Sequence, residues 1–180
     1  MKKLSVFLLL IICLSSCATS KYKSDMPESF KISELSLYMS RASMHSRDFE
    51  HYKVTNKRLF QECGVIRRGR HVPTHQELFD LKDSVYTEAM GRVWTLLELS
   101  AKGEAQFEEP GNTDTIFDPG RVLITIKGNN NSLKITTSVD SIVDTTTKAS
   151  TEANELVRLI RGAAKPAACG NASFYGVNYK

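Results

Sequence analysis

The sequence lacks any long apolar run after its first 14 residues. A helix that crosses a bilayer needs about 20 consecutive apolar residues, so we expect no membrane-spanning helix in the chain. It also lacks an excess of either charge. Two of the 24 basic residues, Lys2 and Lys3, precede residue 17, which leaves 22 against 20 acidic residues. This near-balance gives no reason to expect a nucleic-acid partner.

The usual signatures of catalysis are also missing. The 180 residues contain no Gly-x-Ser-x-Gly turn, no phosphate-binding loop and no Cys-x-x-Cys pair. His71 and His75 are four residues apart, the spacing of two metal ligands on a helix, but Pro73 between them makes a helix improbable. His45 and His51 are interpreted as surface or loop residues. We therefore predict no catalytic residues, no metal site and no cofactor.

The first 16 residues have the pattern of an export signal. Two lysines precede the uninterrupted apolar run 6–14, and a positive start followed by an apolar core of this length is typical of a secretory leader. Leu14-Ser15-Ser16-Cys17 follows, an aliphatic residue and two small residues before a cysteine. This motif resembles the lipobox of bacterial lipoproteins. The alternative is an ordinary secretory signal in which the cysteine stands by chance.

The resemblance to lipoproteins implies cleavage before Cys17, a diacylglyceryl group on its thiol and further acylation of its amine. Several acyl chains on one residue would hold the protein to a membrane permanently, because each buried CH₂ contributes about 0.8 kcal/mol. In proteobacterial lipoproteins a residue other than Asp after the cysteine, here Ala18, favours the outer membrane over the inner. We expect a signal peptide at 1–16, a lipidated cysteine and flexible tether at 17–30, and a single domain at 31–180.

Two cysteines remain for the domain once Cys13 is removed with the leader and Cys17 is lipidated. An even pair in an exported protein suggests a disulfide, here between Cys63 and Cys169. Closing a loop of this size would stabilise the fold by about 4–5 kcal/mol in the chain-entropy model. The alternative is two independent buried thiols.

The pattern of apolar residues predicts hairpins and two helices. Alternation predicts a strand at 32–39, a polar loop at 40–48, and a hairpin from 52–55 and 58–63, with 64–66 as a candidate continuation of its second strand. Next come a basic turn at 67–73, a strand at 78–81 and a helix at 84–100 that Asp83 or Ser84 is expected to cap. A loop at 102–120 leads to a second hairpin from 121–127 and 132–139, a helix at 152–161 and a docked tail at 166–180.

The order ββ(β)α-ββα predicts an α+β fold, in which an antiparallel sheet built from hairpins carries both helices on one face. This order loosely resembles small bacterial lipoprotein domains of unknown function. That resemblance rests on architecture and implies no activity.

A short basic run stands out in the middle of the chain: Arg67, Arg68 and Arg70. A solvated loop and a patch for an anionic partner both fit this run. Without a catalytic motif, we expect a non-enzymatic module of the cell envelope that is held to the membrane by its lipid and binds another envelope protein or a cell-wall component. The alternatives are an inhibitor of an envelope-directed hydrolase, and a hydrolase whose site residues are scattered along the sequence.

Overall fold

The structure is a computed structural model of the 180-residue chain. It describes residues 26, 30–42, 47–107, 120–128, 132–138, 146–164 and 169. Its elements follow one another as β1 (Ile32–Ala42), β2 (Arg47–Thr55), β3 (Arg58–Arg67), β4 (Arg70–Asp80), α2 (Asp83–Ala101), β5 (Arg121–Gly128), β6 (Ser132–Ser138) and α4 (Lys148–Ala163).

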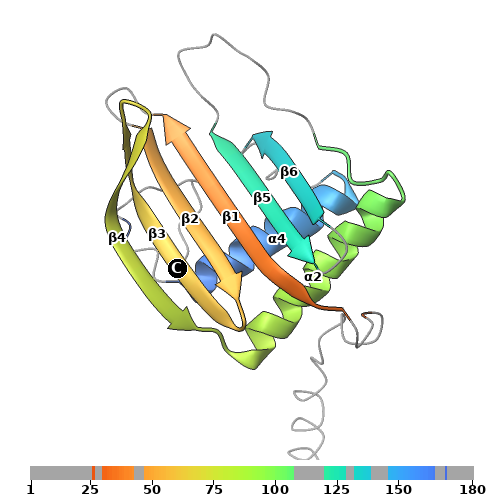
Figure 1. The fold of residues 1–180 in the computed structure, drawn as a ribbon. Helices are drawn as coiled ribbons and strands as arrows, with labels where there is room; N and C mark the ends of the chain where they lie inside the picture. The colour runs from red at the N-terminus through yellow and green to blue at the C-terminus, as the bar shows by residue number, and fades with distance from the viewer. Residues whose placement is uncertain are drawn as a thin grey trace, which may run out of the picture.

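The strands form one six-stranded sheet in the order β4-β3-β2-β1-β5-β6, and every neighbouring pair is antiparallel. Figure 1 shows α2 and α4 together behind this sheet, while its other face turns toward the viewer. The predicted α+β class and its placement of both helices on one face are thus confirmed.

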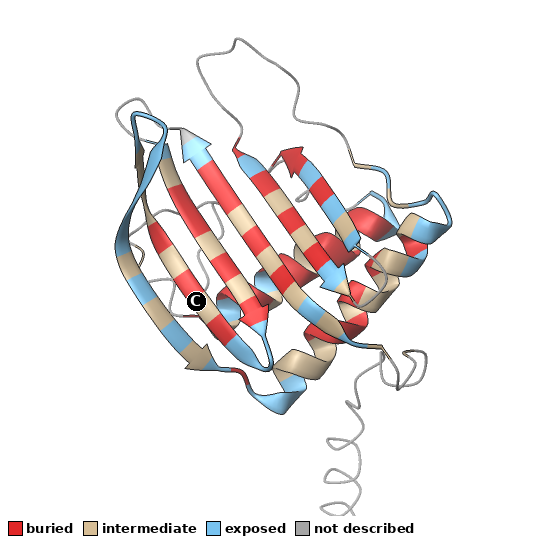
Figure 2. Cartoon of the chain, viewed as in Figure 1, coloured by how far each residue is buried: buried red, intermediate tan, exposed pale blue. Residues whose placement is uncertain are grey.

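Alternation along the strands builds the core between the sheet and the helices. Figure 2 shows buried and partly exposed residues alternating along the central strands. Successive side chains of a strand point to opposite faces, so every second residue turns toward the helices. Leu35, Leu37 and Met39 of β1 are buried in this way and lie beside Ile124 and Ile126 of β5. The helices add a buried stripe of their own: Ala89, Val93, Leu96, Ala153, Leu156 and Ile160.

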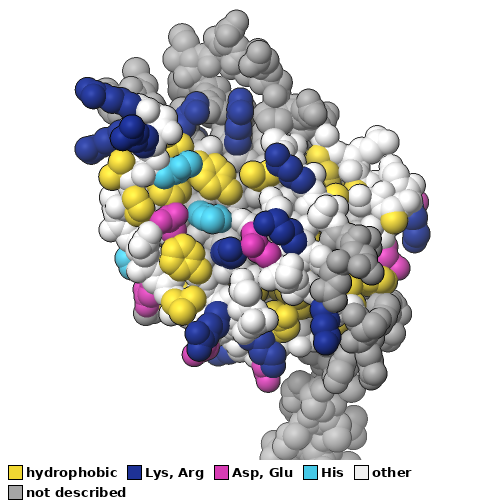
Figure 3. Space-filling view, viewed as in Figure 1, with side chains coloured by type: hydrophobic (Ala, Val, Ile, Leu, Met, Phe, Trp, Pro, Cys, Tyr) yellow, Lys and Arg dark blue, Asp and Glu magenta, His cyan; other side chains and the backbone are white. Residues whose placement is uncertain are grey.

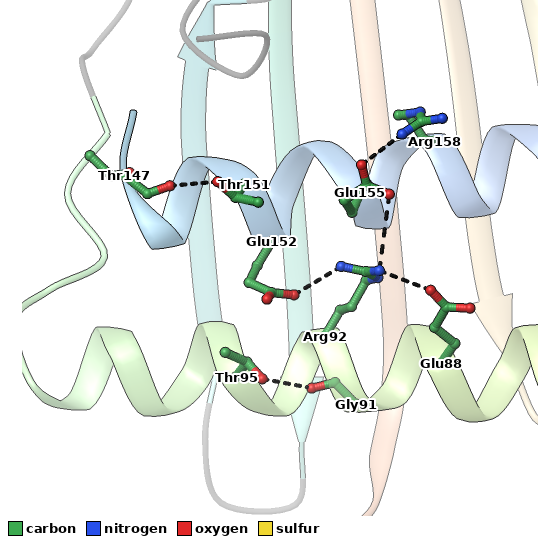
Figure 4. A network of polar contacts seen from close by, with 9 residues as sticks. All are labelled: Glu88, Gly91, Arg92, Thr95, Thr147, Thr151, Glu152, Glu155 and Arg158. Carbon is green, nitrogen blue, oxygen red and sulfur yellow. Dashed lines mark hydrogen bonds and ion pairs between the residues drawn. The ribbon is translucent and has the colours of Figure 1, made fainter. Parts of the chain in front are cut away.

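A charged network joins the two helices (Figure 4). Arg92 of α2 donates to Glu152 of α4 at 3.0 Å and to Glu88, one turn back on its own helix, at 2.9 Å. Glu155 lies 4.0 Å from the same guanidinium. The side chains of Arg92 and Glu152 are each only 11% exposed, so this pair is screened less by water than a surface ion pair would be.

A second polar group lies in the core beside β2. Arg161, in the last turn of α4, contacts Glu50 through two hydrogen bonds, and the Tyr52 hydroxyl donates to the same carboxylate at 2.7 Å. Cys63 and Cys169 lie at disulfide distance nearby, with Cα atoms 5.7 Å apart. The Gln61 amide approaches the Cys169 sulfur at 2.7 Å.

Several boundaries differ from the sequence prediction. The polar loop expected at 40–48 is wrong at both ends, because Ser40–Ala42 and Arg47–Phe49 pair with each other in the ladder between β1 and β2. The basic turn expected at 67–73 is only two residues long, and β4 begins at Arg70. Pro73 is tolerated because β4 is an edge strand and bulges there.

The helix starts also differ. Residue 82, a lysine without a side-chain cap, precedes α2, so neither Asp83 nor Ser84 caps it. The later helix begins at Lys148, four residues before the predicted start. Thr147 and Ser150 exchange hydrogen bonds as a capping box, which satisfies backbone N–H groups that the first turn leaves free. The predicted tail at 166–180 lies outside the described residues except for Cys169.

Candidate functional site

The sheet face that turns away from the helices collects the side chains of interest (Figure 3). We call it the open face. Strand alternation and register place these side chains on it: Glu34, Ser36, Tyr38, Phe49, His51, Lys53, Phe60, Glu62, His71, Leu78, Thr125 and Lys127. In Figure 3, histidine side chains lie among hydrophobic side chains on the left half of this surface, and lysine, arginine and acidic side chains lie beside them and near its middle.

Three neighbouring strands bring a serine, a histidine and a glutamate into line on the open face. Ser36 of β1 lies with its Oγ 2.9 Å from Nε2 of His51 on β2. The other ring nitrogen of His51, Nδ1, is 3.9 Å from a carboxylate oxygen of Glu62 on β3. Burial lowers the pKa of His51, although the Glu62 carboxylate opposes this shift. The imidazole is therefore mostly neutral at pH 7, as a hydrogen-bond acceptor or general base must be.

This alignment has the residue types of a serine hydrolase triad but only part of its geometry. The 3.9 Å between His51 and Glu62 exceeds hydrogen-bond distance. Ser36 lies in the middle of a strand whose register is continuous with Lys53 on one side and Thr125 on the other. The neighbouring backbone N–H groups therefore belong to the sheet ladders and cannot form an oxyanion hole.

An aromatic group lies next to this line of residues. The Tyr38 hydroxyl is 2.8 Å from Nε2 of His71, and the His71 ring meets the Phe49 ring edge to face at 4.7 Å. Phe49 is only 2% exposed although it lies on the open face. Gly64 is opposite Phe49 in the ladder, and a Cβ there would lie 2.2 Å from the Val72 carbonyl oxygen. The missing side chain at Gly64 lets β4 approach closely and carry His71 over Phe49.

Burial and charge modify the polar groups around these rings. Burial raises the pKa of the Tyr38 hydroxyl, so it remains a protonated donor or acceptor at neutral pH. Glu34 lies 3.0 Å from Lys53 and 3.5 Å from Lys127. The hydrogen bond from Lys53 holds the pKa of Glu34 below its usual value. The open face thus carries aromatic, hydroxyl and imidazole groups next to paired charges.

A shallow depression of about 520 Å³ lies at one end of the open face. Its lining combines an aliphatic and an aromatic side chain, Leu78 and Phe60, with the cations Lys53 and Arg58. Leu78 is 56% exposed, one of two large hydrophobic side chains exposed in the described structure. Lys53 is paired with Glu34 at 3.0 Å and Arg58 with Asp80 at 3.7 Å, so the depression presents apolar side chains beside paired charges.

The predicted basic run lies at the opposite end of the sheet. Arg67, Arg68 and Arg70 are exposed around the two-residue turn between β3 and β4. The structure therefore brings these three side chains together at one turn. They lie outside the Ser36–His51 group, at the end of the ladder rather than in its middle.

The structure describes only some of the other residues that the sequence analysis considered. Cys17 and His45 lie outside the described residues. His71 and His75 are both on β4, but the bulge near Gly64 changes the alternation, so that His71 is opposite Ile66 on the open face and His75 is opposite Cys63 on the helix side. Over the described ranges, no cluster of three or more potential metal ligands occurs. None of the helices described is long and apolar enough to cross a membrane.

Sequence reasoning missed the group around His51. It was interpreted as a surface or loop residue because the start of β2 was not recognised. With β2 beginning at Arg47, alternation places His51 on the side opposite to the buried Glu50 and Tyr52. The same alternation along β1 places Ser36 and Tyr38 on the face of the sheet opposite to that of Leu35 and Leu37. The signal was present, but pairing β1 with β2 required knowing where both strands ended.

Comparisons with known proteins add no further assignment: no protein-family model and no curated protein matches this sequence.

Proposed function

We propose that this chain is a cell-envelope lipoprotein, anchored through lipid on Cys17, whose domain is a non-catalytic module that binds a partner protein of the envelope through its open face. The anchor is supported by the lipobox-like Leu14-Ser15-Ser16-Cys17 after a positive and apolar leader. An outer-membrane location is favoured by Ala18. The binding role is carried by one observation, the sheet face that the two helices leave uncovered.

The dimensions of the open face suit a protein partner. Six strands at ~4.8 Å spacing, which are 7 to 11 residues long and rise ~3.3 Å per residue, give a face of roughly 700–900 Å². A standard protein interface buries about 800 Å² on each partner. Interfaces are enriched in aromatic side chains, and Tyr38 and Phe60 lie on this face among polar groups.

Inhibition of an envelope-directed hydrolase is one form that such binding could take. A second candidate is that the chain is itself a hydrolase, and the observation that favours it is the 2.9 Å contact between Ser36 and His51. A fluorophosphonate probe separates the two functions. Labelling that is lost in Ser36→Ala would support the hydrolase, whereas an unlabelled protein would favour the binding module.

Site-specific crosslinking in the native host tests the binding function directly. A photoreactive amino acid replaces Thr125, on the open face, or Glu98, which is exposed on α2 on the other side of the molecule. The proposal expects a discrete protein adduct from position 125 and none of that size from position 98. Equal adducts from both positions, or no adduct from position 125, would contradict the assignment of the open face.

A further inference from the structure

The turn between β3 and β4 has a backbone conformation that one of its two residues, Arg68, does not favour. Arg68 has φ +50° and Gly69 has φ +74°, as a tight two-residue hairpin turn requires. Gly, Asn and Asp adopt these angles readily, whereas a long side chain is disfavoured there. Arg68 is therefore an unfavourable residue for the turn itself. A residue held in an unfavourable backbone conformation often has a functional role.

The other hairpin turn in this half of the sheet gives a comparison. Lys57 also has a positive φ of +63°, but its ammonium group lies 2.8 Å from Asp83 and its carbonyl accepts from the backbone of Leu81. Lys57 thus ties the hairpin to the start of α2. Within the described structure Arg68 has no such contact, and its side chain is exposed. Its positive charge is directed to solvent.

Further arginines lie at the same end of the sheet. Register places Arg47 opposite Ile66, next to the turn, and β1 ends and β5 begins at this end, with Arg41 and Arg121. With the three turn residues this makes six arginines. The described strands contribute one acidic residue here, Asp48, opposite Arg41. Figure 3 shows the cluster of cationic side chains protruding at the upper left, where Figure 1 places the turn.

The chemistry of this end suits phosphate groups on a surface. Guanidinium groups bind phosphate oxygens through two parallel hydrogen bonds. The turn lies at the tip of the hairpin (Figure 1), and its exposed arginines form a protruding surface that can lie against a flat array of phosphates. Val72, 39% exposed, is next to them, and an apolar side chain beside cations favours a lipid surface over a soluble phosphate.

We propose that the β3–β4 turn, with Arg67, Arg68, Arg70 and Val72, is a docking site for a bilayer that contains anionic phospholipid. This site is separate from the open face, and it does not depend on lipidation of Cys17. Each arginine near an anionic surface strengthens binding by about fivefold at moderate salt. Together the three turn arginines would contribute roughly a hundredfold.

The test measures vesicle binding by the mature chain, residues 17–180, with Cys17→Ser so that no lipid is attached. All described strands and helices and both paired cysteines lie within it. Cosedimentation with phosphatidylglycerol-containing vesicles is compared with cosedimentation with phosphatidylcholine vesicles. We expect binding to the anionic vesicles alone, weakened by salt. A triple variant, Arg67→Ser, Arg68→Asn and Arg70→Ser, should bind about a hundredfold more weakly.

A matched control removes three exposed lysines elsewhere: Lys102→Ser, Lys134→Ser and Lys148→Ser. It has the same net charge as the arginine variant and should retain most of the binding. Arg68→Asn alone should weaken binding about fivefold while the melting temperature stays level or rises, because Asn suits the turn. Equal losses in both triple variants, binding to neutral vesicles, or displacement by inorganic phosphate at constant ionic strength would overturn the proposal.

Discussion

Arg161 and Glu50 form a buried ion pair that joins the end of α4 to the middle of the sheet. The guanidinium donates from Nε and from one terminal nitrogen to the two carboxylate oxygens, at 3.0 and 3.1 Å. The side chains are 7% and 2% exposed. Burial raises the pKa of Glu50, while Arg161 and the Tyr52 hydroxyl favour its charged form. The pair fixes where α4 sits on β2.

Glu50→Gln should strongly destabilise the protein, because it leaves the Arg161 guanidinium buried without a counter-charge. We expect the free energy of unfolding in urea to fall by about 3–5 kcal/mol. Replacing both partners, with Glu50→Leu and Arg161→Met, should restore most of that loss, since no charge is then left unpaired. A double variant as unstable as Glu50→Gln would show that packing at this site, and not the charge pair, is what matters.

Cys169→Ser should lower the stability of the protein, because an unfolded chain without the disulfide has more conformational entropy. The pair Cys63–Cys169 spans 106 residues, and the chain-entropy model gives about 4–5 kcal/mol for a loop of that size. Urea unfolding of wild type, with and without reductant, is compared with that of the variant. Reductant should lower the wild type to the level of Cys169→Ser and leave the variant unchanged. Reductant-insensitive wild type would mean that the two thiols are not bonded.

Substitution by alanine should have opposite effects on stability at two of the glycines. A Cβ at Gly64 would lie 2.2 Å from the Val72 carbonyl oxygen and 2.9 Å from Pro73 Cα, both of them backbone atoms. Gly64→Ala should therefore push β4 away and lower the free energy of unfolding by about 1–3 kcal/mol. Gly162 on α4 has nothing within 4 Å of its Cβ position, so Gly162→Ala should be neutral or stabilise by up to about 1 kcal/mol. The melting temperatures of both variants are compared with that of the wild type. Equal changes in the two variants would contradict the close approach of β4 at Gly64.

The strands and helices were largely predictable because each leaves a periodic pattern in its own residues. The hairpin of β5 and β6, with Val122, Ile124 and Ile126 on one face, follows from alternation along the two strands. Polar segments that pair as strands were not predictable in this way. Ser40 and Arg41 look like a loop in the sequence and join the sheet because neighbouring strands pair with them, β2 with both and β5 with Ser40.

The group on the open face was harder to predict for the same reason. Ser36, His51 and Glu62 are separated along the chain, and only the register of three strands makes them neighbours. A single histidine on a polar strand face carries no local signal of its partners. The arginine run could be named from the sequence, but its position at a tight turn depended on where β4 begins.

Stability should depend on pH through His51. Burial lowers the pKa of His51 below its value in the unfolded chain, so the unfolded state binds the proton more tightly. The stabilisation is present above about pH 6.5 and should be lost as the pH falls from there toward the folded pKa. His51→Asn should flatten this part of the curve of unfolding free energy against pH. An unchanged slope in the variant would assign the titration to another group.

The lipid anchor on Cys17 is the claim on which the place of this protein in the cell depends. Intact mass spectrometry of the membrane fraction of the native host tests it most directly, with wild type beside Cys17→Ser. The account predicts a wild-type mass of residues 17–180 plus acyl groups, and the loss of that species in the variant. An unlipidated wild-type product would contradict it, and the domain would then be a freely secreted protein.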